Sequence, residues 1–301
     1  MITIMTPTYN RAYILEKAYL SLKKQTCLDF EWIIIDDGSS DNTEQLVKKW
    51  IQECQNFRIT YLKQPNGGKH RAVNKGVDLA KYEYILILDS DDALAENAVT
   101  KVHEWIADIA GLKSFAGVAG LKANGNNAIG GMIQQAYVDA TNLERRKYRL
   151  LGDKAEVYKT EILKQYPFPE FEDENFIRES AVWDHIAKDG LKLRWYNEII
   201  YLCEYIEDGL TKNTNAETYR KNFNGFTYCA RLYLQTHSGI WALHKCGEFY
   251  DVAKRKGLDI QASAQILQVN RGYLFIGICV FQLKNAVKAI VRKCKATVER
   301  R

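Results

Sequence analysis

Several features are missing from this sequence, and each absence argues against a class of protein. No run of about 18 apolar residues occurs, so we expect no segment that spans a bilayer. The seven cysteines are scattered and without C-x-x-C spacing, which argues against a disulfide framework or a zinc site and favours reduced thiols in a cytosol. The net charge of +5 is too small to indicate nucleic acid as a partner. The first residues, Met1–Met5, carry no basic region of the kind that opens a targeting signal.

What is present is an ordinary globular composition, with 47% apolar and 26% charged residues in a chain of 301. The first 110 residues alternate between short β-rich runs and segments with apolar residues at helical spacing. We expect strands at 2–6, 32–36, 59–62 and 84–88, and helices at 13–25, 42–54, 69–79 and 96–109. Strands separated by helices of this length form a parallel sheet with right-handed crossovers, so the predicted fold class is α/β.

Polar or glycine-rich loops follow all four predicted strands, at the edge where such sheets bind ligands. The loops are Pro7–Arg11, Asp36–Ser40, Pro65–Lys69 and Asp89–Asp92. The last loop places three carboxylates within four residues. Clustered like charges raise one another's pKa and need a compensating cation. Oxygen ligands at this position suit Mg²⁺ or Mn²⁺ shared with a phosphate-bearing substrate, although a solvated turn that caps the next helix is an alternative.

A nucleoside diphosphate would find suitable partners in these loops. Asp37 can accept from the imide N–H of a base, Asp89 from a ribose hydroxyl, and Asp91 can hold the divalent cation. Lys69 can approach the diphosphate, and the main chain around Gly68 can come close because little side-chain bulk intervenes. Asp36 is expected to be structural, in contrast to Asp37.

The remainder of the chain is less regular in pattern. Residues 111–149 contain Gly/Asn-rich turns, and we expect irregular edge structure there. From Asn215 onward the pattern is helical, and the last helix has apolar residues on one face beside a stripe of basic ones. A basic amphipathic helix of this kind indicates membrane-surface contact through Leu274–Arg301, and the alternative is a core-packing helix with a solvated basic face.

The loop series resembles the GT-A glycosyltransferases of family 2. The four motifs of that family appear in order within the first 110 residues: Pro7-Thr8-Tyr9-Asn10, Asp36-Asp37-Gly38-Ser39-Ser40-Asp41, Asn66-Gly67-Gly68 with Ala72-Val73-Asn74-Lys75-Gly76, and Asp89-Ser90-Asp91. As a set they are highly specific, whereas any one of them alone is weak. The Q-x-x-R-W motif of the family's processive synthases is absent, so we expect one sugar per encounter.

The resemblance implies a nucleotide-sugar donor, usually a UDP-sugar, and an inverting displacement. It implies a nucleotide site made of Pro7, Thr8, Tyr9, Asp37, Gly68, Lys69, Asp89, Ser90 and Asp91, and a Mn²⁺ or Mg²⁺ site at Asp91 and Asp89. The family places its general base in an E-D pair at a helix start. Here Glu179 matches the second acid, Arg178 replaces the first, and Asp184 is the substitute candidate, with Asp173 or Glu174 behind it. A purely structural acid at a helix N-terminus is the alternative for Glu179.

Together these features predict a GT-A catalytic domain over residues 1–212 and a helical region over 213–301. Within the domain we expect a nucleotide-binding half (1–110) and an acceptor-binding half (111–212). The expected function is metal-dependent inverting transfer of a hexosyl or N-acetylhexosaminyl group to a glycan or lipid-linked acceptor in bacterial surface polysaccharide synthesis, in the cytoplasm or at the inner face of the membrane. A non-catalytic nucleotide-sugar-binding or glycan-binding module and a sugar nucleotidyltransferase are the competing hypotheses. The nucleotidyltransferase would need a Gly-rich, Arg-Lys-bearing segment that the first loop lacks.

Overall fold

The computed structural model describes residues 1–125, 127–203 and 214–298, with side chains described up to residue 291. The chain forms two compact units. Unit 1 contains Met1–Glu170 and Val182–Gly209, and unit 2 contains Phe171–Ala181 and Leu210–Arg301. The short segment Phe171–Ala181 therefore groups with the C-terminal helices, although in sequence it lies inside the first unit.

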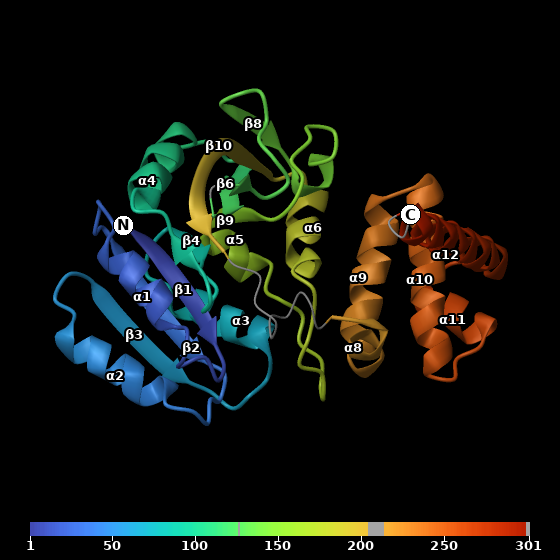
Figure 1. The fold of residues 1–301 in the computed structure, drawn as a ribbon, viewed down its shortest axis with the longest axis horizontal. Coiled ribbons are helices and arrows are strands. Elements are labelled where there is room, and N and C mark those ends of the chain that lie inside the picture. Colours follow the sequence, from blue (N-terminus) through green and yellow to red (C-terminus); the bar gives the residue numbers. More distant parts are fainter. Residues whose placement is uncertain (126, 204–213, 299–301) are drawn as a thin grey trace. The chain divides into compact units, whose positions relative to one another are not determined.

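Unit 1 is a mixed sheet flanked by helices, as Figure 1 shows. The strand order is β3-β2-β1-β4-β9-β6-β10-β5, in which β1 is parallel to β2 and β4, and β2 is parallel to β3. The strands are β1 (Ile2–Thr8), β2 (Phe30–Asp36), β3 (Arg58–Lys63), β4 (Tyr84–Ile87), β5 (Ala93–Leu94), β6 (Phe115–Asn124), β7 (Asn127–Ala128), β8 (Tyr137–Ala140), β9 (Lys154–Lys159) and β10 (Lys192–Leu202). The helices are α1 (Glu16–Lys23), α2 (Thr43–Glu53), α3 (Lys69–Leu79), α4 (Ala98–Asp108), η1 (Asn142–Glu144), α5 (Thr160–Gln165) and α6 (Ser180–Lys188), the last of which crosses into unit 1 from unit 2. The predicted α/β fold and its first four strands and helices are confirmed.

The core explains why the first strands form where they do. Every residue of β1 and β2 is buried, as expected for central strands of a sheet covered on both faces. On one face of the sheet Tyr19 stacks on Trp50 with ring centroids 4.4 Å apart, and Trp32 lies beside both rings. Packing on this scale fixes the strand ends, and with them the loops that follow.

The prediction of irregular structure over residues 111–149 is wrong for its first part. Phe115–Asn124 forms β6, a ten-residue strand between β9 and β10. Two glycines of this strand have close neighbours: a Cβ at Gly117 would lie 2.0 Å from the carbonyl oxygen of Val157 on β9, and one at Gly120 would lie 2.8 Å from the Trp105 ring. Glycine occupies these positions because neighbouring backbone and rings approach too closely for a side chain.

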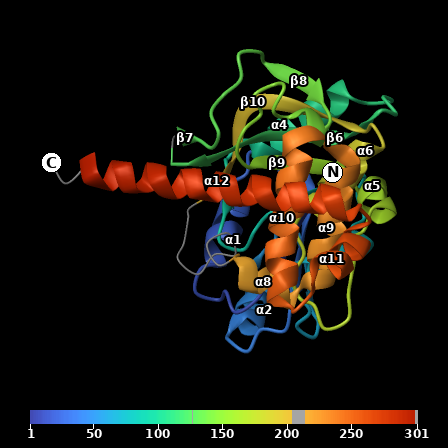
Figure 2. The same ribbon diagram turned by 90° about the vertical axis from the view of Figure 1, so that its right-hand side faces the viewer.

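Unit 2 is helical, with α8 (Ala216–Lys221), α9 (Phe223–Thr236), α10 (Gly239–Arg255), α11 (Ile260–Leu267) and α12 (Arg271–Val298). Its core is built around Phe223, Phe226 and Phe249. Helices α10 and α12 cross closely at Gly247 and Gly277, where a Cβ on Gly247 would lie 2.4 Å from the Gly277 carbonyl oxygen. Figure 2 shows the C-terminal part of α12 extending beyond the other helices of its unit.

The expectation that no segment spans a bilayer meets one candidate helix among the described residues. The part of α12 from Arg271 to Val291 is long and apolar enough to cross a membrane, and most of it is exposed. The expectation relied on an unbroken apolar run, whereas this helix contains lysines at positions 284 and 288 among its apolar residues. Length and composition alone do not establish a span.

Candidate active site

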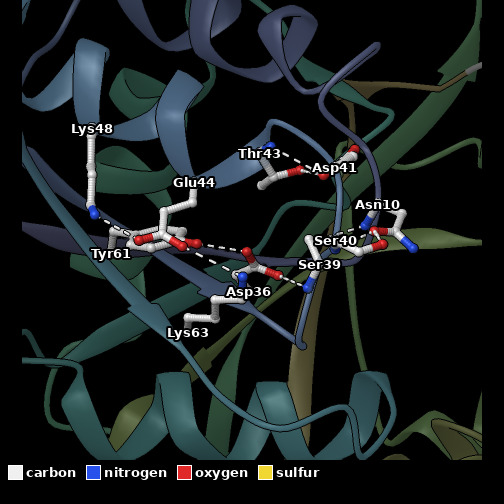
Figure 3. Close-up of polar contacts among 10 residues, drawn as sticks. All are labelled: Asn10, Asp36, Ser39, Ser40, Asp41, Thr43, Glu44, Lys48, Tyr61 and Lys63. Carbon is white, nitrogen blue, oxygen red and sulfur yellow. Dashed lines mark hydrogen bonds and ion pairs between the residues drawn. The ribbon is translucent and has the colours of Figure 1, made fainter.

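The loops after β1 and β2 are joined by hydrogen bonds, as Figure 3 shows. The Asn10 amide donates to the Ser39 hydroxyl (2.8 Å), and the Ser40 amide donates to the Asn10 side-chain oxygen (2.8 Å). Asn10 has a left-handed backbone, with φ of 52°, a conformation that asparagine tolerates better than most residues. The Asp41 carboxylate accepts from the amides of Ala12 (2.9 Å) and Thr43 (3.1 Å), so it ties the first loop to the start of α2.

Two neighbouring aspartates after β2 have different partners. Asp36 is fully buried and accepts from the Ser39 amide (2.8 Å) and from the Tyr61 hydroxyl (2.6 Å) on β3, contacts that are drawn in Figure 3. These contacts are structural. Asp37 accepts from four donors in the loop after β3: the amides of Gly67 (2.9 Å) and Gly68 (2.7 Å) and the side chains of Gln64 (2.8 Å) and Asn66 (3.2 Å).

Four donors use about all of the acceptor sites of one carboxylate. Asp37 therefore shapes the Gly67–Gly68 turn, in which Gly68 has a φ of 97° that disfavours other residues. Contact between Asp37 and a nucleotide base remains a prediction, and it would require one of these donors to be displaced.

The acidic loop after β4 divides its three carboxyl groups among different partners. The Asp89 carboxylate forms an ion pair with Lys69 (2.6 Å), at the start of α3. The Asp92 carboxyl is hydrogen-bonded to Tyr201, whose hydroxyl also accepts from the Asp89 amide (2.9 Å). Among the described residues, the Asp91 carboxylate accepts no hydrogen bond from another residue.

Electrostatics in this loop follow from burial and crowding of like charges. Burial, and then the charge of Asp89, raise the pKa of Asp91. Burial and the charges of Asp89 and Asp91 raise the pKa of Asp92 to about 7. Burial pushes the pKa of Asp89 upward as well, but the ammonium groups of Lys69 and Lys122 outweigh it and hold that pKa below the ordinary value. The loop thus carries more negative charge than its surroundings readily accommodate, and a cation would relieve it.

The donor set fits a metal ion that is shared with a ligand. No three His, Cys, Asp or Glu side chains converge on one point in the part of the chain that the structure describes. Asp91 and Asp89 supply hard oxygen ligands of the kind that Mg²⁺ and Mn²⁺ prefer, and Mg²⁺ typically completes its coordination with water and substrate phosphates. A divalent ion here would depend on oxygen atoms that the protein does not provide.

The other predicted nucleotide-site residues lie at the same sheet edge. Pro7 and Thr8 end β1, Tyr9 follows with its ring about half exposed, and Ser90 is buried within the acidic loop. The Thr8 hydroxyl is buried without a hydrogen-bond partner among the described residues. The structure therefore brings the predicted residues of the four loops to one edge.

The candidate bases differ in how they are held. Glu174 is buried and accepts from the amides of Asn224 (2.7 Å) and Gly225 (2.8 Å) at the start of α9, so it caps that helix and is not retained as a candidate base. Asp184, in α6, accepts from the Asn142 side chain (3.0 Å).

Glu179 is exposed and lies in unit 2, directly before α6. Its neighbour Arg178 is hydrogen-bonded to the hydroxyl of Tyr219, and the role of Glu179 remains a prediction.

Sequence reasoning missed three residues near the site. Tyr201 and Lys122 come from β10 and β6 and reach the acidic loop only through tertiary contacts. His70 follows Lys69 on α3, is buried, and has a ring Nδ1 without a hydrogen-bond partner among the described residues. Its burial lowers its pKa to about 4. Of the three, only His70 was adjacent to a recognised motif.

Comparison with known proteins gives a consistent result along the chain. Residues 3–151 match the family model described as Glycosyl transferase family 2. The glycosyltransferase GlyG of Streptococcus pneumoniae is 35% identical over 109 residues, which is 36% of each protein. The chain thus aligns with about a third of the length of that relative. The GalNAc(5)-diNAcBac-PP-undecaprenol beta-1,3-glucosyltransferase of Campylobacter jejuni is 25% identical over 89% of this chain and 92% of its own length.

Solved structures show the same fold at low identity. S. aureus TarS in complex with UDP-GlcNAc superposes with a TM-score of 0.60 and 19% identity, covering 93% of this chain and 79% of that one. The mannosyltransferase PcManGT from Pyrobaculum calidifontis, in complex with GDP-Man and Mn²⁺, gives a TM-score of 0.56 and 15% identity, covering 93% and 86% of the two chains. The predicted GT-A fold and family resemblance are confirmed, and the first half of the chain, residues 3–151, belongs to glycosyl transferase family 2.

Proposed function

We propose that this protein is a metal-dependent, inverting glycosyltransferase that uses a UDP-sugar. The observation that carries the proposal is the acidic loop, in which Lys69 and Tyr201 engage Asp89 and Asp92 while Asp91 stays available at the sheet edge. The acceptor would be a hydroxyl of a glycan or lipid-linked saccharide in bacterial surface polysaccharide synthesis, with a hexosyl or N-acetylhexosaminyl group transferred. The UDP-GlcNAc in the TarS complex and the undecaprenol-linked substrate named for the C. jejuni relative support these choices.

The nucleotide end of the donor would lie along the four loops. Asp91, with Asp89, would hold the divalent ion, which when bound supplies Lewis-acid stabilisation of the leaving diphosphate. The Lys69 ammonium, beside the Gly67–Gly68 turn, would exchange Asp89 for a phosphate oxygen and add positive charge where the donor bond breaks. Tyr9, about half exposed, offers a ring face for the base.

Inversion needs a group that takes the proton of the acceptor hydroxyl as its oxygen bonds to the sugar C1 and the C1–phosphate bond breaks. Glu179 is the proposed base. It is exposed at the start of α6, and the adjacent Arg178 is held by Tyr219. Asp184 is the substitute if Glu179 proves dispensable.

Sugar transfer and nucleotide binding should separate in variants. With UDP-sugars, Mn²⁺ and acceptor extracts, Asp91→Asn should lose transfer and metal-dependent UDP binding. The control Asp29→Asn changes a half-exposed acid directly before β2 and should keep both. Glu179→Gln should abolish transfer with UDP affinity nearly intact, and Glu172→Gln, an exposed acid of the same segment, serves as its control. UDP binding without turnover under all conditions would instead support the non-catalytic module.

A membrane surface is the proposed location of the acceptor. On α12 the side chains of Leu283 and Ile290 are 69% and 61% exposed, and on α10 Ile240 is 63% exposed. The ammonium of Lys284 lies 5.4 Å from the ring centroid of the exposed Trp241, so cationic and apolar groups share this part of unit 2. Apolar side chains with lysines alongside suit an anionic lipid surface at the inner face of the cell membrane. The predicted contact region Leu274–Arg301 includes side chains beyond Val291 that lie outside the described ones.

Sedimentation with lipid vesicles tests this location. Deletion of residues 283–301 should release the protein from vesicles containing anionic lipid, and neutral vesicles should retain less of the full chain than anionic ones do. Equal sedimentation of the full and shortened chains would refute the membrane proposal and leave the proposed chemistry untouched.

A further inference from the structure

We propose that Tyr201 is a positioning residue that holds the acidic loop in the shape required for metal binding. The inference rests on the proposed function, because it assumes that the loop binds a divalent ion. Tyr201 lies near the end of β10 and is fully buried. At that point β10 pairs with β5, the two-residue strand that directly follows the acidic loop, in the register Tyr201–Leu94.

The Tyr201 hydroxyl joins both ends of the loop. It accepts from the Asp89 amide at 2.9 Å, and because an amide can only donate, its own proton is left for the Asp92 carboxyl. One hydroxyl therefore fixes the first and the last acid of a four-residue loop. Asp91 lies between these two acids in the sequence. Its orientation therefore depends on the hydrogen bonds that Tyr201 makes to Asp89 and Asp92.

The neighbouring strand supports the same ring. Lys122 of β6 is paired in register with Tyr201, and its ammonium lies 4.2 Å from the Tyr201 ring centroid. This cation–π contact, together with the burial of the ring, holds Tyr201 independently of its hydroxyl. A Tyr201→Phe substitution thus keeps the ring and its packing and removes only the two hydrogen bonds to the loop.

Loss of such an outer partner typically weakens metal binding by about 10- to 100-fold. For Tyr201→Phe we expect the Kd for Mn²⁺, measured with the full chain and UDP by electron paramagnetic resonance of free Mn²⁺, to rise within that range. UDP affinity in EDTA should stay unchanged, and kcat should recover at saturating Mn²⁺. A change in kcat that excess Mn²⁺ does not restore would overturn the proposal.

Tyr196→Phe is a matched control on the same strand. Tyr196 is also buried and donates to a carboxylate, that of Asp108 on α4, at 2.7 Å. The Tyr196→Phe substitution removes a hydrogen bond of the same kind at a place away from the acidic loop, so the Kd for Mn²⁺ should remain that of the wild type. An equal rise in both variants would mean a general loss of stability, and would overturn a specific role for Tyr201.

A second variant keeps the test decisive if Tyr201→Phe folds poorly. Asp92→Ala removes the other end of the same hydrogen bond and should raise the Kd for Mn²⁺ as well, whereas an unchanged Kd would overturn the proposal. Where both single variants fold, the double variant should raise the Kd for Mn²⁺ by less than the two single effects combined, because both substitutions remove the same hydrogen bond between Tyr201 and Asp92. Failure of the wild type to bind Mn²⁺ with UDP would contradict the proposed function itself, while wild-type binding with an unaffected Tyr201→Phe would contradict only this inference.

Discussion

The free energy of unfolding should fall as the pH rises because the Asp92 carboxyl loses its proton, and Asp92→Asn should remove that part of the pH dependence. The side chain is 7% exposed and lies beside Asp89 and Asp91. Burial and these two charges raise its pKa to about 7, from an ordinary value of 3.8. Asparagine has nearly the same shape, carries no charge, and keeps an oxygen that accepts the Tyr201 proton.

The sign of the effect follows from proton binding. Between the two pKa values the folded protein holds a proton on Asp92 that the unfolded chain has lost, so the free energy of unfolding of the wild type falls as the pH rises. A pKa difference of about three units corresponds to about 4 kcal/mol in total, of which about 2 to 3 kcal/mol falls between pH 5 and pH 8. The stability of Asp92→Asn relative to the wild type should therefore increase by that amount over this range.

Urea unfolding in EDTA measures the difference, since chelation keeps divalent ions off the loop. Tryptophan fluorescence suits the assay because five of the six tryptophans lie in unit 1: Trp32, Trp50, Trp105, Trp183 and Trp195. A difference between the two proteins that stays constant from pH 5 to pH 8 would refute the argument, since it would mean that Asp92 takes up no proton in this range.

Asp41→Asn is the control with the opposite sign. Burial works to raise the pKa of Asp41, but hydrogen bonds from Thr43 and Ala12 outweigh it and lower the pKa. A carboxylate of this kind stabilises the fold above its unfolded pKa, and the contribution is lost as the pH falls through the folded one. Asp41→Asn should therefore be less stable than the wild type at neutral pH, with a gap that narrows toward pH 3.

Three further predictions concern other parts of the chain. Glu174→Ala should lower the free energy of unfolding of unit 2 by about 1 to 3 kcal/mol, because two amides at the start of α9 lose their acceptor. Urea unfolding followed by circular dichroism measures this change, and the control Glu172→Ala should have little effect. Gly117→Ala should lower the melting temperature sharply, because its Cβ would meet backbone on β9, whereas Gly272→Ala, with its nearest atom at 3.4 Å, should be tolerated. Lys69→Ala should weaken UDP binding about 10- to 100-fold and leave uridine binding unchanged in titration calorimetry, since only the phosphates lose a charged partner.

The sequence predicted the first half of the fold well because the signal there is local. Continuous burial of β1 and β2 appears as unbroken apolar runs, and helix faces appear at helical spacing. Parallel strands place their following loops at one edge, so the grouping of the four loops required no tertiary information beyond that rule. Strand β6 was missed because Gly/Asn-rich turns follow it in the sequence, whereas the close packing of Gly117 on β9 and of Gly120 on Trp105 is not visible in the local pattern.

The partners of the site residues could not be predicted in the same way. The Asp37 carboxylate was assigned to a nucleotide base, and only the structure shows its four donors, which lie 27 to 31 residues away. Tyr201 lies 112 residues from the loop that it holds. Glu174, in an acidic stretch considered for catalysis, proves to cap a helix that begins about fifty residues later.

Residue order alone was thus enough for the family, the α/β class and the carboxyl edge at which the acids gather, since periodic burial and strand direction are properties of neighbouring residues. Folding in three dimensions decided which carboxylate is engaged: Lys69 pairs with Asp89 and Tyr201 with Asp92, whereas Asp91 accepts no hydrogen bond from another described residue. The physical reason is that hydrogen bonds and charge interactions depend on distance through space, and the chain brings those distant groups together only when it folds.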